Sequence, residues 1–98
     1  MLYAAKCYWP GVTETELRRA ADRAARDAET TAGSESDVAY FGSILFPDDA
    51  LVLCMFEASS RPAVWELSRR AGIPCERVMD SVWLARPLLE RNQRCASS

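Results

Sequence analysis

The sequence predicts an α+β domain in which four strands form one antiparallel sheet and two helices cover one of its faces. Three observations predict this class: two segments with helical periodicity, four apolar segments of strand-like composition, and their β-α-β-β-α-β order. This order is the split βαβ arrangement of ferredoxin-like domains. Because the chain has 98 residues, one core is expected. We assign residues 1–85 to this domain and residues 86–98 to a polar C-terminal tail.

The first half of the chain predicts one strand and one helix. Residues 2–9 are rich in aromatic and small apolar side chains, and the Pro10-Gly11 pair ends the strand. Thr13 and Glu16 form a capping box, which indicates a helix start. The small side chains of its apolar stripe allow the helix to lie close to the sheet. That stripe consists of Leu17, Ala20, Ala21, Ala24, Ala25 and Ala28.

The second half predicts three strands and one helix. Residues 38–46 and 51–58 are apolar and flank a Pro-Asp-Asp turn, which is typical of neighbouring strands. Ser60 is suited to cap a helix that ends at Gly72, a residue that favours the left-handed C-cap position. We expect the last strand at residues 78–84.

Both faces of the predicted sheet are apolar. A strand with one solvated face alternates apolar and polar residues, whereas these strands do not. Two helices cover only one face, so we predict a sheet-to-sheet homodimer. Alternatively, the C-terminal tail could fold over the second face of the sheet, with Leu88 and Leu89 in contact with it. In the strand at residues 51–58, Leu51, Leu53 and Met55 are expected on one face and Val52, Cys54 and Phe56 on the other. In the strand at residues 38–46, Tyr40, Ile44 and Phe46 are expected on one face and Ala39, Phe41 and Leu45 on the other.

Composition excludes several classes of function. The net charge is −2, which argues against a nucleic-acid binder, since such proteins carry a basic face. No apolar run approaches the length of about 20 residues that spans a bilayer, and the start of the chain lacks an export pattern. We therefore expect a cytoplasmic protein with reduced cysteines. The four glycines form no phosphate-binding motif, and we expect no cofactor.

Short motifs in a fixed order cover the chain from Tyr8 to Leu84. They lie at residues 8–13, 16–17, 53–60, 63–64, 70–74 and 76–78. In order and spacing they resemble a family of small bacterial ferredoxin-like domains of mostly unknown function that includes nickel-binding proteins. This resemblance implies the same fold over nearly the whole chain.

The resemblance does not carry nickel binding with it. It implies that nickel-binding members have histidines at positions that correspond here to the neighbourhood of Ala21, to Ser68 and to Ile73. This chain has no histidine, and of that ligand set only Cys54 is retained. Nickel prefers imidazole, thiolate and carboxylate ligands. We therefore expect a histidine-free branch of the family that binds no nickel.

The first functional hypothesis is an accessory protein that holds a small organic molecule in an apolar pocket. Aromatic side chains can line an apolar pocket for a flat organic ligand, although aromatic residues in strands also occur in cores and dimer interfaces. The predicted ligand-binding residues are Tyr8, Tyr40, Met55 and Trp83.

Two alternatives stay open. The first is a cofactor-independent enzyme of isomerase, cyclase or oxygenase type, by analogy with other proteins of this fold. Its proton-transfer groups would be Lys6, Tyr8, Glu57 or Asp80, and convergence of Lys6, Glu57 and Asp80 in one pocket would favour it.

The second alternative is a metal or redox site at Cys7 and Cys54, which lie on neighbouring predicted strands, although buried free cysteines usually act as small apolar residues.

Overall fold

The structure is a computed structural model that describes residues 1–31, 33 and 37–84. It confirms the predicted order of elements. The tail predicted at residues 86–98 lies outside the described residues. The elements are β1 (Leu2–Tyr8), α1 (Glu14–Thr31), β2 (Val38–Phe46), the short 3-10 turn η1 (Pro47–Asp49), β3 (Leu51–Ala58), α2 (Arg61–Arg70) and β4 (Cys75–Ser81).

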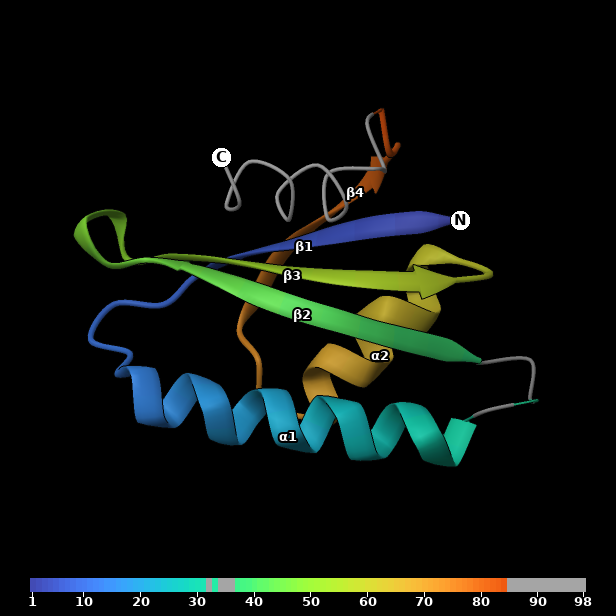
Figure 1. Cartoon of the computed structure of the whole chain (residues 1–98), viewed down its shortest axis with the longest axis horizontal. Coiled ribbons are helices and arrows are strands. Elements are labelled where there is room, and N and C mark those ends of the chain that lie inside the picture. Colours follow the sequence, from blue (N-terminus) through green and yellow to red (C-terminus); the bar gives the residue numbers. More distant parts are fainter. Residues whose placement is uncertain (32, 34–36, 85–98) are drawn as a thin grey trace, which may run out of the picture.

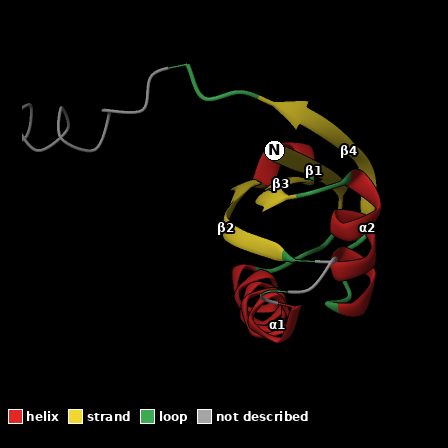
Figure 2. Cartoon of the chain, turned by 90° about the vertical axis from the view of Figure 1, so that its right-hand side faces the viewer, coloured by secondary structure: helices red, strands yellow, loops and turns green. Residues whose placement is uncertain are grey.

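The four strands form one antiparallel sheet in the order β2-β3-β1-β4. β1 is therefore central, and β2 and β4 are the edges. Both helices lie on the same side of the sheet, as Figures 1 and 2 show. This is the predicted ferredoxin-like arrangement, and neither of the two described helices covers the opposite face of the sheet. We call that face the open face.

The capping box starts α1 as predicted. The Thr13 hydroxyl accepts a hydrogen bond from the Glu16 amide at 3.0 Å, and the Thr13 amide donates to the Glu16 carboxylate at 3.3 Å. The buried stripe is narrower than expected, because Ala21 is only half-buried and Ala25 is exposed. The buried residues of α1 are Leu17, Ala20, Ala24 and Ala28.

The ends of α2 also match the prediction. The Ser60 side chain accepts a hydrogen bond from the Ala63 amide, and Gly72 has the left-handed φ of +74° that a C-terminal cap requires. The Arg23 guanidinium of α1 donates to the carbonyl of Ala71 at 2.9 Å. This bond joins the end of α2 to α1.

The prediction for the last strand was wrong by three residues at each end. β4 begins at Cys75 and ends at Ser81, which pairs with Leu2 at the end of β1. Residues 82–84 extend beyond Leu2, the first paired residue of β1, and they are exposed. Glu76 and Arg77 look like loop residues in the sequence, yet an edge strand tolerates such polar side chains.

The predicted division of β2 between the two faces was also wrong. The register with β3 shifts between Tyr40 and Gly42, which marks a β-bulge. A bulge inserts one extra residue and reverses the alternation beyond it. Tyr40 and Leu45 therefore pack against the helix-side core, and Phe41, Ile44 and Phe46 are exposed on the open face.

The core lies between the sheet and the helices. Phe56 is the largest fully buried side chain, and Leu67 of α2 is fully buried as well. On the open face, Tyr8, Phe41 and Ile44 are each more than half exposed. Neither of the two described helices is long and apolar enough to cross a membrane.

Candidate functional site

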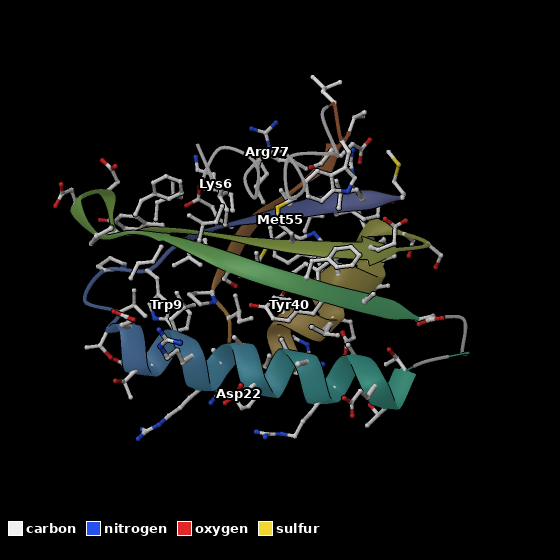
Figure 3. The ribbon with its side chains drawn as sticks, in the orientation of Figure 1. Lys6, Trp9, Asp22, Tyr40, Met55 and Arg77 are labelled. Carbon is white, nitrogen blue, oxygen red and sulfur yellow. The ribbon has the colours of Figure 1, made fainter. Side chains whose placement is uncertain are left out.

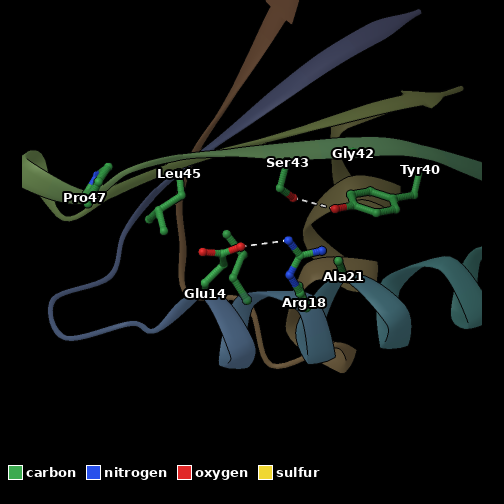
Figure 4. Close-up of a pocket in the computed structure, with 9 residues that line it drawn as sticks. Glu14, Arg18, Ala21, Tyr40, Gly42, Ser43, Leu45 and Pro47 are labelled. Carbon is green, nitrogen blue, oxygen red and sulfur yellow. Dashed lines mark hydrogen bonds and ion pairs between the residues drawn. The ribbon is translucent and has the colours of Figure 1, made fainter.

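A hollow of about 600 Å³ lies between the first turns of α1 and the edge strand β2. Figure 4 shows it between the helix and the strand, with side chains entering from both. We call it the α1–β2 pocket. Its lining residues are Glu14, Leu17, Arg18, Ala21, Tyr40, Gly42, Ser43, Leu45 and Pro47.

Two local features of the sequence produce this pocket. Ala21 carries only a methyl group where a larger residue of α1 would reach towards β2. The bulge at Gly42, whose φ of +137° favours glycine, brings Ser43 and Leu45 to the helix side of the strand. The wall is thus mostly apolar, and its polar groups are few and localised.

A chain of hydrogen bonds runs from the pocket into the core. The Ser43 hydroxyl donates to the Cys54 sulfur at 3.0 Å and lies 2.5 Å from the Tyr40 hydroxyl. Because the Ser43 proton is directed at Cys54, the Tyr40 hydroxyl donates to Ser43. Burial raises the pKa of Tyr40, so this phenol is neutral at physiological pH. The inner end of the pocket therefore carries hydroxyl groups without charge.

An ion pair lies at the outer end of the pocket. The Arg18 guanidinium donates to the Glu14 carboxylate at 2.7 Å, one turn apart on α1 (Figure 4). Both side chains are mostly exposed. The pair is neutral as a whole, and the free edge of the guanidinium retains hydrogen-bond donors for an incoming group.

The structure does not bring the four predicted ligand-binding residues together. Tyr40 lines the α1–β2 pocket. Met55 lies on the other side of the sheet from Tyr40 (Figure 3), and Tyr8 is exposed on that same open face. Trp83 follows the end of β4 and is 56% exposed.

The predicted proton-transfer groups are also dispersed. Lys6 lies 3.9 Å from the Glu76 carboxylate, Glu57 pairs with the amino group of Met1, and Asp80 accepts from Arg61 at 2.9 Å on the helix side. Glu57 pairs across the sheet with Leu2, four residues from Lys6, which is about 13 Å along a strand. The three predicted groups therefore form three separate ion pairs at the surface and do not converge in one pocket.

Cys7 and Cys54 both face the helices and are fully buried. They lie on neighbouring strands as predicted, where Cys7 is opposite Val52 and Cys54 is opposite Ala5. The two cysteines are therefore diagonal neighbours. Within residues 1–31, 33 and 37–84, no three His, Cys, Asp or Glu side chains are placed to hold a metal ion.

Sequence reasoning missed most of the pocket, including Glu14, Arg18, Ser43 and Leu45. The Glu14–Arg18 spacing is a visible signal for an ion pair on a helix, but nothing in the sequence places that pair beside β2. Gly42 within an apolar strand is the one available signal for the bulge.

Comparison with known proteins identifies the family. The model of the family described as "Nickel responsive protein SCO4226-like" matches residues 6–80. The chain belongs to this family. Its structure is similar to the crystal structure of SCO4226 from Streptomyces coelicolor A3(2), with a TM-score of 0.67 and 19% sequence identity over 87% of this chain and 100% of the other. That likeness supports the shared fold. No curated protein matches the chain.

This member of the SCO4226-like family lacks the imidazole donors that nickel prefers. The sequence has no histidine, and Cys54 has its sulfur engaged by the Ser43 hydroxyl. Ser68, which occupies one of the positions where the family resemblance implies a histidine, is buried, and its hydroxyl has no hydrogen-bond partner. A neutral hydroxyl is a poor ligand for nickel beside imidazole or thiolate.

Proposed function

We propose that this member of the SCO4226-like family is a binding protein that holds a small organic molecule in the α1–β2 pocket and does not use nickel. The observation that carries the proposal is the pocket itself. Its volume of about 600 Å³ lies in the range of sites for small ligands, and such sites combine an apolar wall with a few localised polar groups.

The lining indicates the chemistry of the ligand. Leu17, Ala21, Leu45 and the Tyr40 ring offer an apolar surface for a flat or branched hydrocarbon body. Arg18 at the mouth offers guanidinium donors to an acidic group. We therefore infer a ligand with an apolar body of drug-like size and one anionic or strongly hydrogen-bonding end.

We also propose that two copies pair through the open face. The exposed fractions there are 59% for Phe41, 57% for Tyr8 and 54% for Ile44. These side chains belong to one sheet face, and monomers rarely expose large contiguous apolar patches. A second copy is the occupant we favour, because a flat apolar sheet face is complementary to itself under two-fold symmetry.

The enzyme alternative has less support. Proton-transfer catalysis needs a titratable group within hydrogen-bond reach of the reacting atom in a shielded site. Lys6, Glu57 and Asp80 are each engaged in an ion pair at the surface, and none of them lines the α1–β2 pocket. A binding role needs only the shape and the donors that the pocket offers.

Filling the pocket tests the proposal. Ala21→Phe places a ring in the space between α1 and β2 without touching the buried stripe. Titration with 8-anilinonaphthalene-1-sulfonate, an aromatic dye with one anionic group, measures binding by fluorescence. We expect the substitution to weaken dye affinity at least about tenfold, which corresponds to about 1.4 kcal/mol.

Ala25→Phe is the matched control. Ala25 lies one turn further along α1 and is not part of the pocket lining, so the same substitution there leaves the affinity within about twofold of the parent. Equal dye binding by the Ala21→Phe variant and the parent would place the dye elsewhere and contradict the proposed site.

A further inference from the structure

Three cysteines form a row across the helix side of the sheet. Cys54 lies on β3, Cys7 on the central strand β1 and Cys75 on β4. All three are free thiols. Cys7 is the middle member of the row, and its thiol donates a hydrogen bond to the Ala5 carbonyl oxygen at 3.6 Å. Since adjacent strands are about 4.8 Å apart, the outer two thiols are too far apart to converge with Cys7 on one metal ion.

The register distinguishes the two pairs within this row. Cys7 and Cys75 lie directly opposite each other in the β1–β4 pairing. Directly opposed residues of antiparallel strands have Cα atoms about 4.5–5.5 Å apart, which is within the range of about 4.4–6.8 Å that a disulfide spans. Cys54 is displaced by two residues from the position opposite Cys7. Such diagonal neighbours are about 7–8 Å apart, which is beyond that range.

The three cysteines also differ in how accessible they are to solvent. Cys7 and Cys54 are fully buried, whereas Cys75 is half-buried. Cys75 lines a second hollow of about 280 Å³ together with Trp65, Arg69 and Ile73. An oxidant as small as hydrogen peroxide therefore reaches Cys75 from solvent and meets Cys7 behind it.

We propose that Cys75 and Cys7 form a redox pair, in which Cys75 reacts first with a hydroperoxide and Cys7 then closes a disulfide between β4 and β1. Cys54 stays a thiol. The inference does not rest on the binding function proposed above, because neither Cys75 nor Cys7 lines the α1–β2 pocket.

The chemistry balances in two steps. The Cys75 thiolate attacks one peroxide oxygen; a sulfur–oxygen bond forms, the oxygen–oxygen bond breaks, and the departing hydroxide takes a proton to become water. The Cys7 sulfur then attacks the sulfenic sulfur of Cys75; the disulfide bond forms, and the sulfenic hydroxyl leaves with the Cys7 proton as a second water. The thiol pair loses two electrons and two protons, and the peroxide is reduced.

The electrostatics of the row assign the same order of events. The neighbouring Cys54 and Cys75 thiols, together with burial, raise the pKa of Cys7. Interaction with Cys7 lowers the pKa of both the Cys75 and the Cys54 thiols, and of these two only Cys75 is accessible. The accessible sulfur thus has the larger thiolate fraction, and the thiolate is the form that attacks a peroxide. Cys7 retains its proton until the second step.

Peptide mapping tests the proposal. The protein carries Cys95→Ser, since residue 95 lies outside the described part of the chain. The native protein is treated with hydrogen peroxide, its remaining thiols are blocked with N-ethylmaleimide in denaturant, and it is digested with trypsin. The three cysteines then fall on separate peptides, at residues 7–18, 27–69 and 71–77. We expect peptide 7–18 linked to peptide 71–77, and Cys54 alkylated.

Single variants separate the roles. In Cys75→Ser, Cys7 and Cys54 both remain alkylated after peroxide, because no accessible thiol starts the reaction. In Cys7→Ala, Cys75 is trapped by dimedone as a sulfenic acid. Cys54→Ala is the matched control and keeps the link. A link from peptide 7–18 to peptide 27–69, a link between two copies of peptide 71–77, or full alkylation of Cys7 and Cys75 in the peroxide-treated parent would each overturn the proposal.

Discussion

Replacing Phe56 with alanine should lower the free energy of unfolding by about 3–5 kcal/mol, the usual cost of removing a buried phenylalanine ring. Phe56 is the largest fully buried side chain, and its ring centroid lies 5.4 Å from that of Tyr40. The substitution therefore leaves a cavity below the centre of the sheet. Urea denaturation followed by circular dichroism measures the change.

Trp65→Ala is the control for this result. It removes a larger ring, but Trp65 is 41% exposed on α2, so the expected loss is under about 1 kcal/mol. If the two substitutions destabilise the protein equally, the core does not lie where the structure places it.

Replacing Ile44 with aspartate should convert a dimer of the protein into a monomer. Ile44 is 54% exposed on the open face, so the fold of a single copy tolerates the change. In a sheet-to-sheet interface the same carboxylate would be buried without a partner, which weakens association by at least about 2 kcal/mol, or about 30-fold. Light scattering should show twice the chain mass of 10.9 kDa for the parent and 10.9 kDa for the variant.

Trp65→Asp is the matched control here, because it places the same charge on an exposed aromatic position of the helix layer. It should leave the dimer intact. A monomeric parent at tens of micromolar would contradict the pairing. If a chain cut after Leu84 then dimerises, the occupant of the open face is the segment 85–98 and not a second copy.

The fold was predictable because each of its elements has a local signal. Side-chain and backbone chemistry within a few residues explains three of these signals. They are the capping box at Thr13, the N-cap at Ser60 and the end of the second helix at Gly72. The end of β4 was not predictable in this way. It is set by the length of β1, since strand pairing stops at Leu2, and this is a constraint between segments distant in sequence.

The candidate site was predictable only at Tyr40. The bulge at Gly42 decides which side chains of β2 face α1, and a glycine in a strand signals a bulge without fixing the register beyond it. The relation of Cys75 to Cys7 was missed for a similar reason. Residues 68 positions apart become direct partners through the shifted register between Lys6 and Cys7, and no spacing rule shows this.

We propose above all that the ligand binds in the α1–β2 pocket. Intermolecular nuclear Overhauser effects test this most directly. The measurement uses isotope-labelled protein with unlabelled 8-anilinonaphthalene-1-sulfonate. We predict contacts from the dye protons to the methyl groups of Leu17, Ala21 and Leu45, which line the pocket. Contacts confined to the methyl groups of Ile44, Leu53 and Met55 on the open face would contradict the account.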